Sequence, residues 1–120
     1  MTSKYSLLEF TQMYGNDELL IATPNDEKLY TIILLDENAK QKYFIHLLKI
    51  NNHDVIQPYT PPHPPAGTGD HKYSILIYEQ KNEIDPNSLK DTPRSGFNLL
   101  SFSSQYNLRL ISSSSFIVYN

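Results

Sequence analysis

The chain has 120 residues, a formal net charge of −3 and a pI of about 5.7, and its length suits a single domain spanning residues 1–120. Lysine and arginine are scattered and form no basic run, which argues against a nucleic-acid partner. Cysteine is absent, so a disulfide framework and a thiolate metal site are excluded. Because no run reaches the roughly 18 apolar residues of a membrane span and no signal peptide is evident, we expect a cytoplasmic protein with at most peripheral membrane contact.

The first predicted strands follow a mixed segment at residues 1–28. Residues 29–35 are rich in β-forming side chains and too short for a typical helix, so they predict a buried strand. Residues 43–50 predict a second strand. Strict alternation would place four of its side chains on one face: Phe44, His46, Leu48 and Ile50.

A stiff connection rich in proline and glycine occupies residues 56–72. It holds five of the eight prolines and two of the four glycines. Prolines fix φ and remove backbone donors, whereas glycines permit positive φ and close approach to a ligand. Because long loops in compact domains are usually functional or disordered, this loop is a candidate functional segment.

The remaining predicted elements are a strand at 73–80, a short helix within 95–106 and a final strand at 116–119. The helix is indicated by apolar residues spaced three or four apart. The fold class is therefore all-β, or mostly β, with one or two short helices near the carboxyl terminus.

Four polar residues in these elements form a candidate anion site. Asp36 follows one buried strand, His46 lies on the next, and His71 and Tyr73 follow the loop. Imidazole N–H and tyrosine hydroxyl groups donate to phosphate oxygens, and a charged partner strengthens such bonds. Glycine-rich backbone turns free amides toward an anion, and an Asp beside a His fixes the tautomer of the ring.

Each of these features also has a structural or competing interpretation. Asp36 stands in the position of a turn or capping residue, and His46 and His71 suit a half-buried histidine and a turn. Together with His63, these three residue types also suit a zinc site. The prolines within 61–65 fit the PxxP pattern of ligands for SH3-like domains.

Three motifs stand in a fixed order along the chain. Asp36-Glu37-Asn38-Ala39 ends one strand, and His46 lies in the next. Pro64-Pro65-Ala66-Gly67-Thr68-Gly69-Asp70-His71-Lys72-Tyr73 then leads into a strand that ends in Tyr78-Glu79-Gln80. This order resembles the phosphatidylethanolamine-binding protein family over roughly residues 29–119, with 1–28 corresponding to a shortened amino-terminal part.

The resemblance implies an antiparallel β-sandwich with a small surface pocket for phosphate-type head groups. It implies no catalytic residue, no metal and no cofactor. By motif position, the ligand-binding residues would be Asp36, Phe44, His46, His63, Pro64, Pro65, Gly69, His71 and Tyr73.

The chain departs from the family pattern at several of these positions. Asn38 stands where the family has a second Asp, and Glu37 and Lys40 stand where it has prolines. His63 replaces the Gly before the paired prolines, and Lys72 replaces an Arg. His63 would either narrow the pocket or add a donor, and Lys40 would either attract an anion or remain solvated.

The resemblance implies a non-enzymatic binding or regulatory protein. Its ligand would be a phosphate-containing small molecule, a phosphatidylethanolamine-like head group or a phosphorylated segment of a partner. Modulation of kinase signalling is one implied role, with a protein kinase or phosphoprotein as partner. The alternative is a hydrolase or protease-inhibitor role for the same His/Asp pocket, and the hydrolase lacks an activated nucleophile because no serine lies in a nucleophile-elbow motif.

Overall fold

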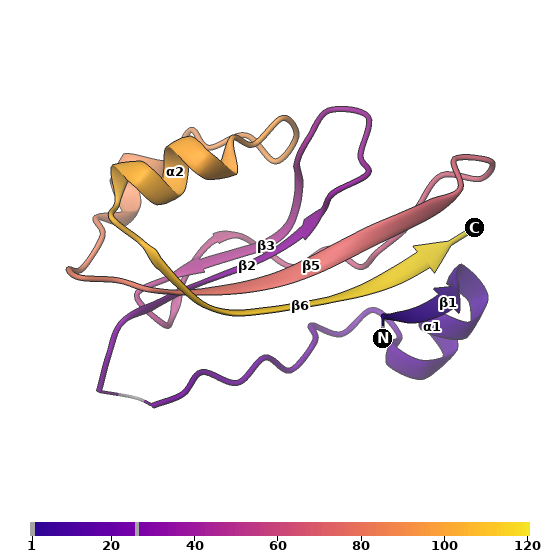
Figure 1. Ribbon diagram of the computed structural model, residues 1–120, viewed down its shortest axis with the longest axis horizontal. Helices are drawn as coiled ribbons and strands as arrows, with labels where there is room; N and C mark the ends of the chain where they lie inside the picture. Colours follow the sequence, from indigo (N-terminus) through magenta and orange to yellow (C-terminus); the bar gives the residue numbers. More distant parts are fainter. Residues whose placement is uncertain (1, 26) are drawn as a thin grey trace.

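The computed structural model describes residues 2–25 and 27–120, which form one six-stranded sheet flanked by short helices (Figure 1). The elements in chain order are β1 (Ser3–Ser6), α1 (Leu7–Tyr14), β2 (Tyr30–Asp36), β3 (Phe44–Ile50), β4 (Asp54–Gln57), β5 (Asp70–Glu79), the 3₁₀ helix η1 (Pro86–Leu89), α2 (Leu99–Gln105) and β6 (Arg109–Tyr119). The prediction of a mostly β fold with short helices is confirmed. No helix within the described residues is long and apolar enough to cross a membrane.

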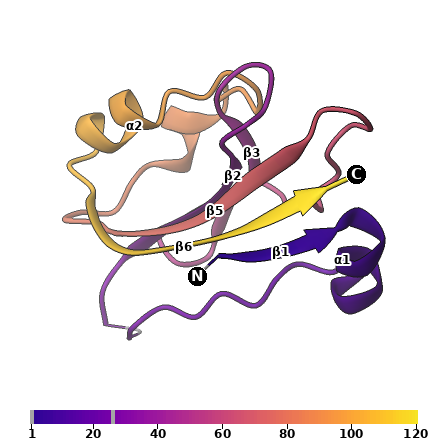
Figure 2. The ribbon, with the colours of Figure 1, turned by 45° about the vertical axis from the view of Figure 1, so that its right-hand side comes forward.

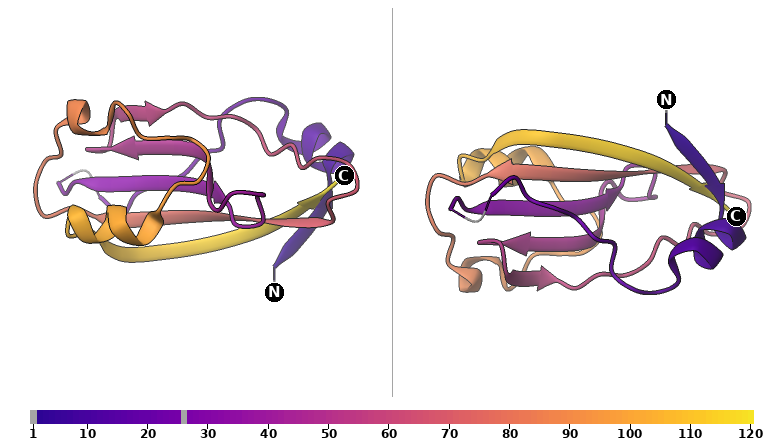
Figure 3. Two further views of the ribbon diagram at one scale, coloured as in Figure 1. Left: turned by 90° about the horizontal axis from the view of Figure 1, so that it is seen from above. Right: turned by 90° about the horizontal axis from the view of Figure 1, so that it is seen from below.

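The sheet has the strand order β1-β6-β5-β2-β3-β4. The views from above and below show the long strands β5 and β6 side by side (Figure 3). Every pair is antiparallel except β1 with β6. The expected strands are present as β2, β3, β5 and β6, although β5 and β6 begin earlier than the sequence indicated. β1, α1 and β4 were not predicted.

Alternation along the strands sends apolar side chains to both faces of the sheet, where they form two clusters. The α2-side cluster includes Ile33 and Leu35 of β2 and is covered by Phe102 of α2. The α1-side cluster includes Leu34 of β2 and is covered by Phe10 of α1. Figure 2 shows the two helices on opposite sides of the sheet, so its buried faces are closed by helices and loops.

A β-bulge interrupts the pairing of β2 with β3. Leu34 pairs with Leu47, but Leu35 pairs with Ile45, so His46 is an extra residue without a partner across the ladder. A bulge bends its strand and redirects the side chain of the extra residue. His46 therefore sits on the α1 side, where its ring centroid lies 5.2 Å from that of Tyr73.

Because of this bulge, the expected alternation of side chains along the second strand is wrong. Leu48 and Ile50 pack in the α2-side cluster, on the opposite face from His46. Because a slip of one residue exchanges the two faces of a strand, alternation counted from Phe44 fails beyond His46.

A buried polar network closes the far end of the sheet around Gln80, the last residue of the Tyr-Glu-Gln motif. Its Oε1 accepts hydrogen bonds from Thr31 Oγ1 at 2.8 Å and from the Asn51 backbone N–H at 2.9 Å. Its Nε2 donates to Asn51 Oδ1 at 2.9 Å and to the Asn82 carbonyl at 3.0 Å. Both polar atoms of this side chain are thus fully used, and the residue is 6% exposed.

We predict that Gln80→Ala lowers the free energy of unfolding by about 3 kcal/mol, because buried groups of Thr31 and Asn51 lose their partners. Urea denaturation followed by circular dichroism measures the change. Gln105→Ala, at an exposed glutamine of α2, is the matched control and should change stability by less than about 0.5 kcal/mol. Equal losses in the two variants would contradict the network's role.

Candidate functional site

Antiparallel pairing brings the candidate residues to one end of the sheet. β2 ends where its neighbours β3 and β5 begin, and Asp36 pairs with Phe44 on one side and with Tyr73 on the other. The loop at residues 58–69 passes over this end. A cavity of about 560 Å³ lies between the loop and the strands.

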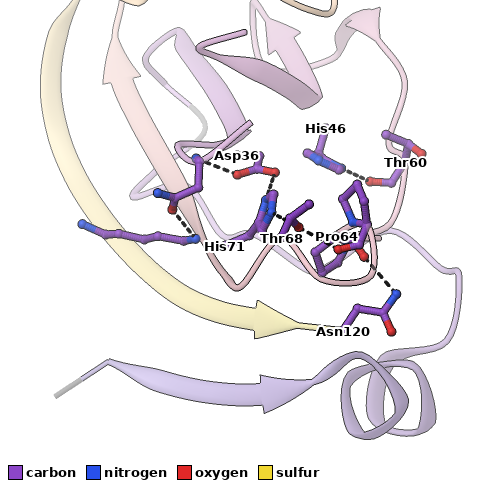
Figure 4. Close-up of polar contacts among 10 residues, drawn as sticks. Asp36, His46, Thr60, Pro64, Thr68, His71 and Asn120 are labelled. Carbon is purple, nitrogen blue, oxygen red and sulfur yellow. Dashed lines mark hydrogen bonds and ion pairs between the residues drawn. The ribbon is translucent and has the colours of Figure 1, made fainter. Parts of the chain in front are cut away.

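A chain of hydrogen bonds runs along one wall of the cavity (Figure 4). His71 Nδ1 lies 2.7 Å from Asp36 Oδ2, and His71 Nε2 lies 2.8 Å from Thr68 Oγ1. Thr68 Oγ1 donates to the Pro65 carbonyl at 2.6 Å. The single hydroxyl proton of Thr68 is used in the bond to Pro65. All three hydrogen bonds of the series can therefore form when both ring nitrogens of His71 donate. The arrangement therefore suits an imidazolium facing a carboxylate.

The carboxylate of Asp36 is fully engaged. Besides His71 on Oδ2, it accepts the backbone N–H of Asn38 on Oδ1 at 2.8 Å. Asn38 Oδ1 in turn accepts the backbone N–H of Lys72 at 2.8 Å. The side chains of Asp36 and His71 are 7% and 5% exposed, so this ion pair is shielded from water and fixes the His71 ring and the loop after β2 in place.

His46 faces the cavity as a neutral ring. Its Nδ1 donates to the Thr60 carbonyl at 2.8 Å. Burial lowers the pKa of His46, and the hydrogen bond to Thr60 and the charge of Asp36 offset only part of this effect. At neutral pH the ring therefore carries no charge, and among the described residues its Nε2 has no hydrogen-bond partner.

The hydroxyl of Tyr73 is a buried donor without a partner among the described residues. The residue is 0% exposed, and its ring stacks on Phe116 with a centroid distance of 5.5 Å. Burial is the first cause that raises the pKa of Tyr73, so the hydroxyl keeps its proton. An unmade hydrogen bond at such a group costs about 1–3 kcal/mol. An acceptor in the cavity would remove this cost.

An arginine that the sequence analysis did not assign to the site holds one wall in place. Arg94 Nη1 donates to the Ile45 carbonyl at 2.8 Å and Nη2 to the Pro58 carbonyl at 3.0 Å. Its guanidinium also lies 5.9 Å from the ring centroid of Phe44. Arg94 thus joins the start of the loop to β3, and its position far along the chain gave no signal of this role.

Most of the predicted site residues meet at the cavity, and two do not. The predicted residues that line it are Asp36, Phe44, His46, His63, Pro65, His71 and Tyr73. Pro64 is buried with its carbonyl accepting from Asn120 Nδ2 at 3.0 Å, and Gly69 lies in an exposed turn with φ of 79°. Neither lines the cavity, because the chain turns away from it at these residues. Asn38, Lys40, Thr60, Pro61 and Thr68 also line it.

The competing interpretations of these residues lose their geometric basis. Within residues 2–25 and 27–120, no group of three His, Asp or Glu side chains is arranged to hold a metal ion. The reason is that His71 and Asp36 are bonded to each other and His46 Nδ1 is bonded to Thr60. Pro62 and Pro64 are buried, which argues against a PxxP ligand for another domain.

A sequence model of the phosphatidylethanolamine-binding protein family matches residues 30–110, which include most of this cavity. The chain belongs to the phosphatidylethanolamine-binding protein family. A curated relative, the 26 kDa secreted antigen of Toxocara canis, is 32% identical over 105 residues, covering 72% of this chain. The chain spans only 39% of the antigen's length.

Two solved structures share the fold of this family member. The carboxypeptidase Y inhibitor in complex with its cognate proteinase is 21% identical with a TM-score of 0.65, over 83% of this chain and 64% of that chain. The phosphatidylethanolamine-binding protein from Plasmodium vivax is 11% identical with a TM-score of 0.66, over 99% of this chain and 78% of that chain. At these identities the two structures show that the fold is shared.

The expected cytoplasmic location is contradicted by the curated relative, which is a secreted antigen. That expectation rested only on absences, the absence of cysteine among them. Missing features do not define a compartment, because a protein without disulfides is stable inside or outside the cell when its core suffices.

We predict that Asp36→Ala lowers the free energy of unfolding by about 3 kcal/mol, because it leaves a buried imidazolium without its counter-charge. The matched control is Asp70→Ala, which removes an ion pair with Lys4 whose side chains are 49% and 53% exposed. An exposed pair contributes at most about 1 kcal/mol. Chemical denaturation at pH 7 compares the two, and similar losses would contradict a special role for Asp36.

Proposed function

We propose that this member of the phosphatidylethanolamine-binding protein family is a non-enzymatic binding protein whose cavity holds a phosphate-type anion. The observation that carries the proposal is the buried, unpartnered hydroxyl of Tyr73 at the base of the cavity. A donor in that position is satisfied by an acceptor that comes from outside the chain.

The neighbours of Tyr73 support an anionic ligand. His71 is fixed in the wall, with Nδ1 2.7 Å from Asp36 Oδ2 and Nε2 2.8 Å from Thr68 Oγ1. His46 offers Nε2, which becomes a second donor when an anion draws a proton onto the ring. Phe44 and Pro65 supply apolar walls that exclude water and so strengthen charge-assisted hydrogen bonds.

An enzymatic role has one observation in its favour, since Asp36, His71 and Thr68 are connected in the order of a catalytic triad. The direction of the hydrogen bonds opposes it. Thr68 donates its proton to the Pro65 carbonyl, so His71 Nε2 acts toward Thr68 as a donor and not as a base. The arrangement therefore favours a role for His71 in binding.

The biological partner follows less directly from the cavity. The carboxypeptidase Y inhibitor is 21% identical to this chain, so that likeness supports the shared fold alone. Inhibition of a protease is therefore the alternative function and not the main proposal. The secreted antigen supports action outside the cell for this chain as well. A secreted protein does not meet kinases of the cytoplasm, so this relative speaks against the predicted modulation of kinase signalling.

We predict that Tyr73→Phe weakens the binding of inorganic phosphate about tenfold, because it removes the donor at the base of the cavity. Tyr59→Phe is the matched control. Its hydroxyl is also buried without a partner among the described residues, but Tyr59 does not line the cavity, and burial raises its pKa to about 12. Isothermal titration calorimetry or NMR shifts of the His46 and His71 rings measure the affinities. An equal effect of both variants, or no phosphate binding by the wild type at millimolar concentration, would contradict the proposal.

We predict that sulfate binds more tightly as the pH falls from 8 to 5.5. Burial holds the pKa of His46 low in the free protein, and a bound anion stabilises the protonated ring and raises that pKa. Affinity therefore rises as pH falls through the bound-state pKa and levels off below the lowered free-state pKa. Sulfate is the probe because its own charge is constant over this range.

The other charged or titratable groups at the cavity are Asp36, Lys40, His63 and His71. His46→Asn keeps a donor for the Thr60 carbonyl but removes the titration, so it should flatten the pH dependence. His63→Asn is the comparison variant and should retain it. A pH dependence that persists in His46→Asn and disappears in His63→Asn would contradict the assignment.

A further inference from the structure

Among the described residues that line the cavity, the one carboxylate is Asp36, and it is already paired with His71. Both of its oxygens already accept hydrogen bonds. An ammonium group entering the cavity would lose water without gaining a counter-charge. Such a loss is costly for any charge that is taken out of water.

The aromatic wall is also unsuited to an ammonium group. Phe44 lines the cavity, and the guanidinium of Arg94 already lies 5.9 Å from its ring centroid. A ring attracts a cation through the negative charge of its face. A second cation at Phe44 would meet the positive charge of Arg94.

Two donors at the mouth remain uncommitted. Lys40 and His63 both line the cavity, are exposed, and form no hydrogen bond or ion pair with the described residues. Four other lysines have acidic partners, among them Lys4 with Asp70 and Lys72 with Glu37, whereas Lys40 has none among the described residues. Lys40 is thus positioned beside the cavity with its charge available to a ligand.

Three of the departures from the family pattern line the cavity and make it less negative, whereas Glu37 adds a negative charge outside the lining, where it pairs with Lys72. Asn38 removes a negative charge, Lys40 adds a positive one, and His63 adds a donor, and all three residues line the cavity. Each change favours an anion with more charge and more free oxygens.

Building on the proposed function, we propose that the cavity is selective for a phosphomonoester over a phosphodiester and over a head group that carries an ammonium. A monoester presents about two negative charges and three free oxygens at pH 7. The buried hydroxyl of Tyr73, and His46 once its ring is protonated by the bound anion, would serve the inner oxygens, and Lys40 and His63 would serve the outer charge.

Two pairs of small ligands test this selectivity at pH 7.5 by calorimetry. Phenyl phosphate is a monoester, whereas methyl phenyl phosphate is a diester with less negative charge. We expect the monoester to bind about tenfold more tightly. Propyl phosphate and phosphoethanolamine have nearly the same shape and differ in the ammonium group. We expect propyl phosphate to bind at least about fivefold more tightly.

N-acetylphosphoserine methylamide and glycerol 3-phosphate then distinguish a protein from a lipid source of the monoester.

Matched variants assign the selectivity to the mouth of the cavity. The double variant Lys40→Gln, His63→Gly should reduce the monoester preference to about twofold or less. Lys42→Gln removes an exposed lysine that does not line the cavity and should leave the preference unchanged.

The outcomes separate this inference from the function on which it rests. If phosphate and both esters bind with similar affinity, the selectivity is wrong and the anion cavity stands. A preference that survives the double variant overturns the assignment to Lys40 and His63. If none of these anions binds the wild type, the proposed function and the selectivity both fail.

Discussion

The buried contact between Asp36 and His71 joins two segments that are 35 residues apart in the sequence. Asp36 ends β2 between its two neighbouring strands, His71 begins β5, and Asn38 holds the loop that follows β2. A buried carboxylate is stable only with such partners, and removing one of them costs more than the pair itself contributes. The cavity, the loop above it and the orientation of the His71 ring all depend on this contact. Both oxygens of Asp36 already accept hydrogen bonds. The contact therefore also determines whether the cavity accepts a positive or a negative ligand group.

The bulge at His46 provides the second requirement of the site. Regular pairing from Leu47 would send residue 46 toward the α2 side, away from Tyr73 and the cavity. The extra residue turns the imidazole to the α1 side, and the Thr60 carbonyl then fixes which nitrogen faces inward. Local irregularity in the sheet thus creates the site, while the regular pairing of β2 with β5 keeps its base rigid.

Strand positions and the polar residues of the site could be predicted because each depends on local sequence. Runs of β-forming residues mark β2 and β3, and the motif around His71 marks the loop. Helix α1 also has a local signal in the sequence, since Ser6 and Glu9 stand at the spacing of a capping box at its start. The bulge was not predictable, because it depends on which residue of a partner strand lies opposite.

Charge at short range, and not the charge of the whole protein, controls what this cavity binds. The net charge of −3 repels anions weakly, but at physiological salt that field is screened over about 8 Å. Inside the cavity, His71 is held by Asp36, and the buried Tyr73 hydroxyl is a donor that loses no water when a ligand arrives. The cost of desolvating these groups was met when the chain folded, so a ligand oxygen gains most of the hydrogen-bond energy. An acidic protein can therefore hold an anion, provided that the donors are buried and that Asp36, the one carboxylate among the described residues lining the cavity, is already paired.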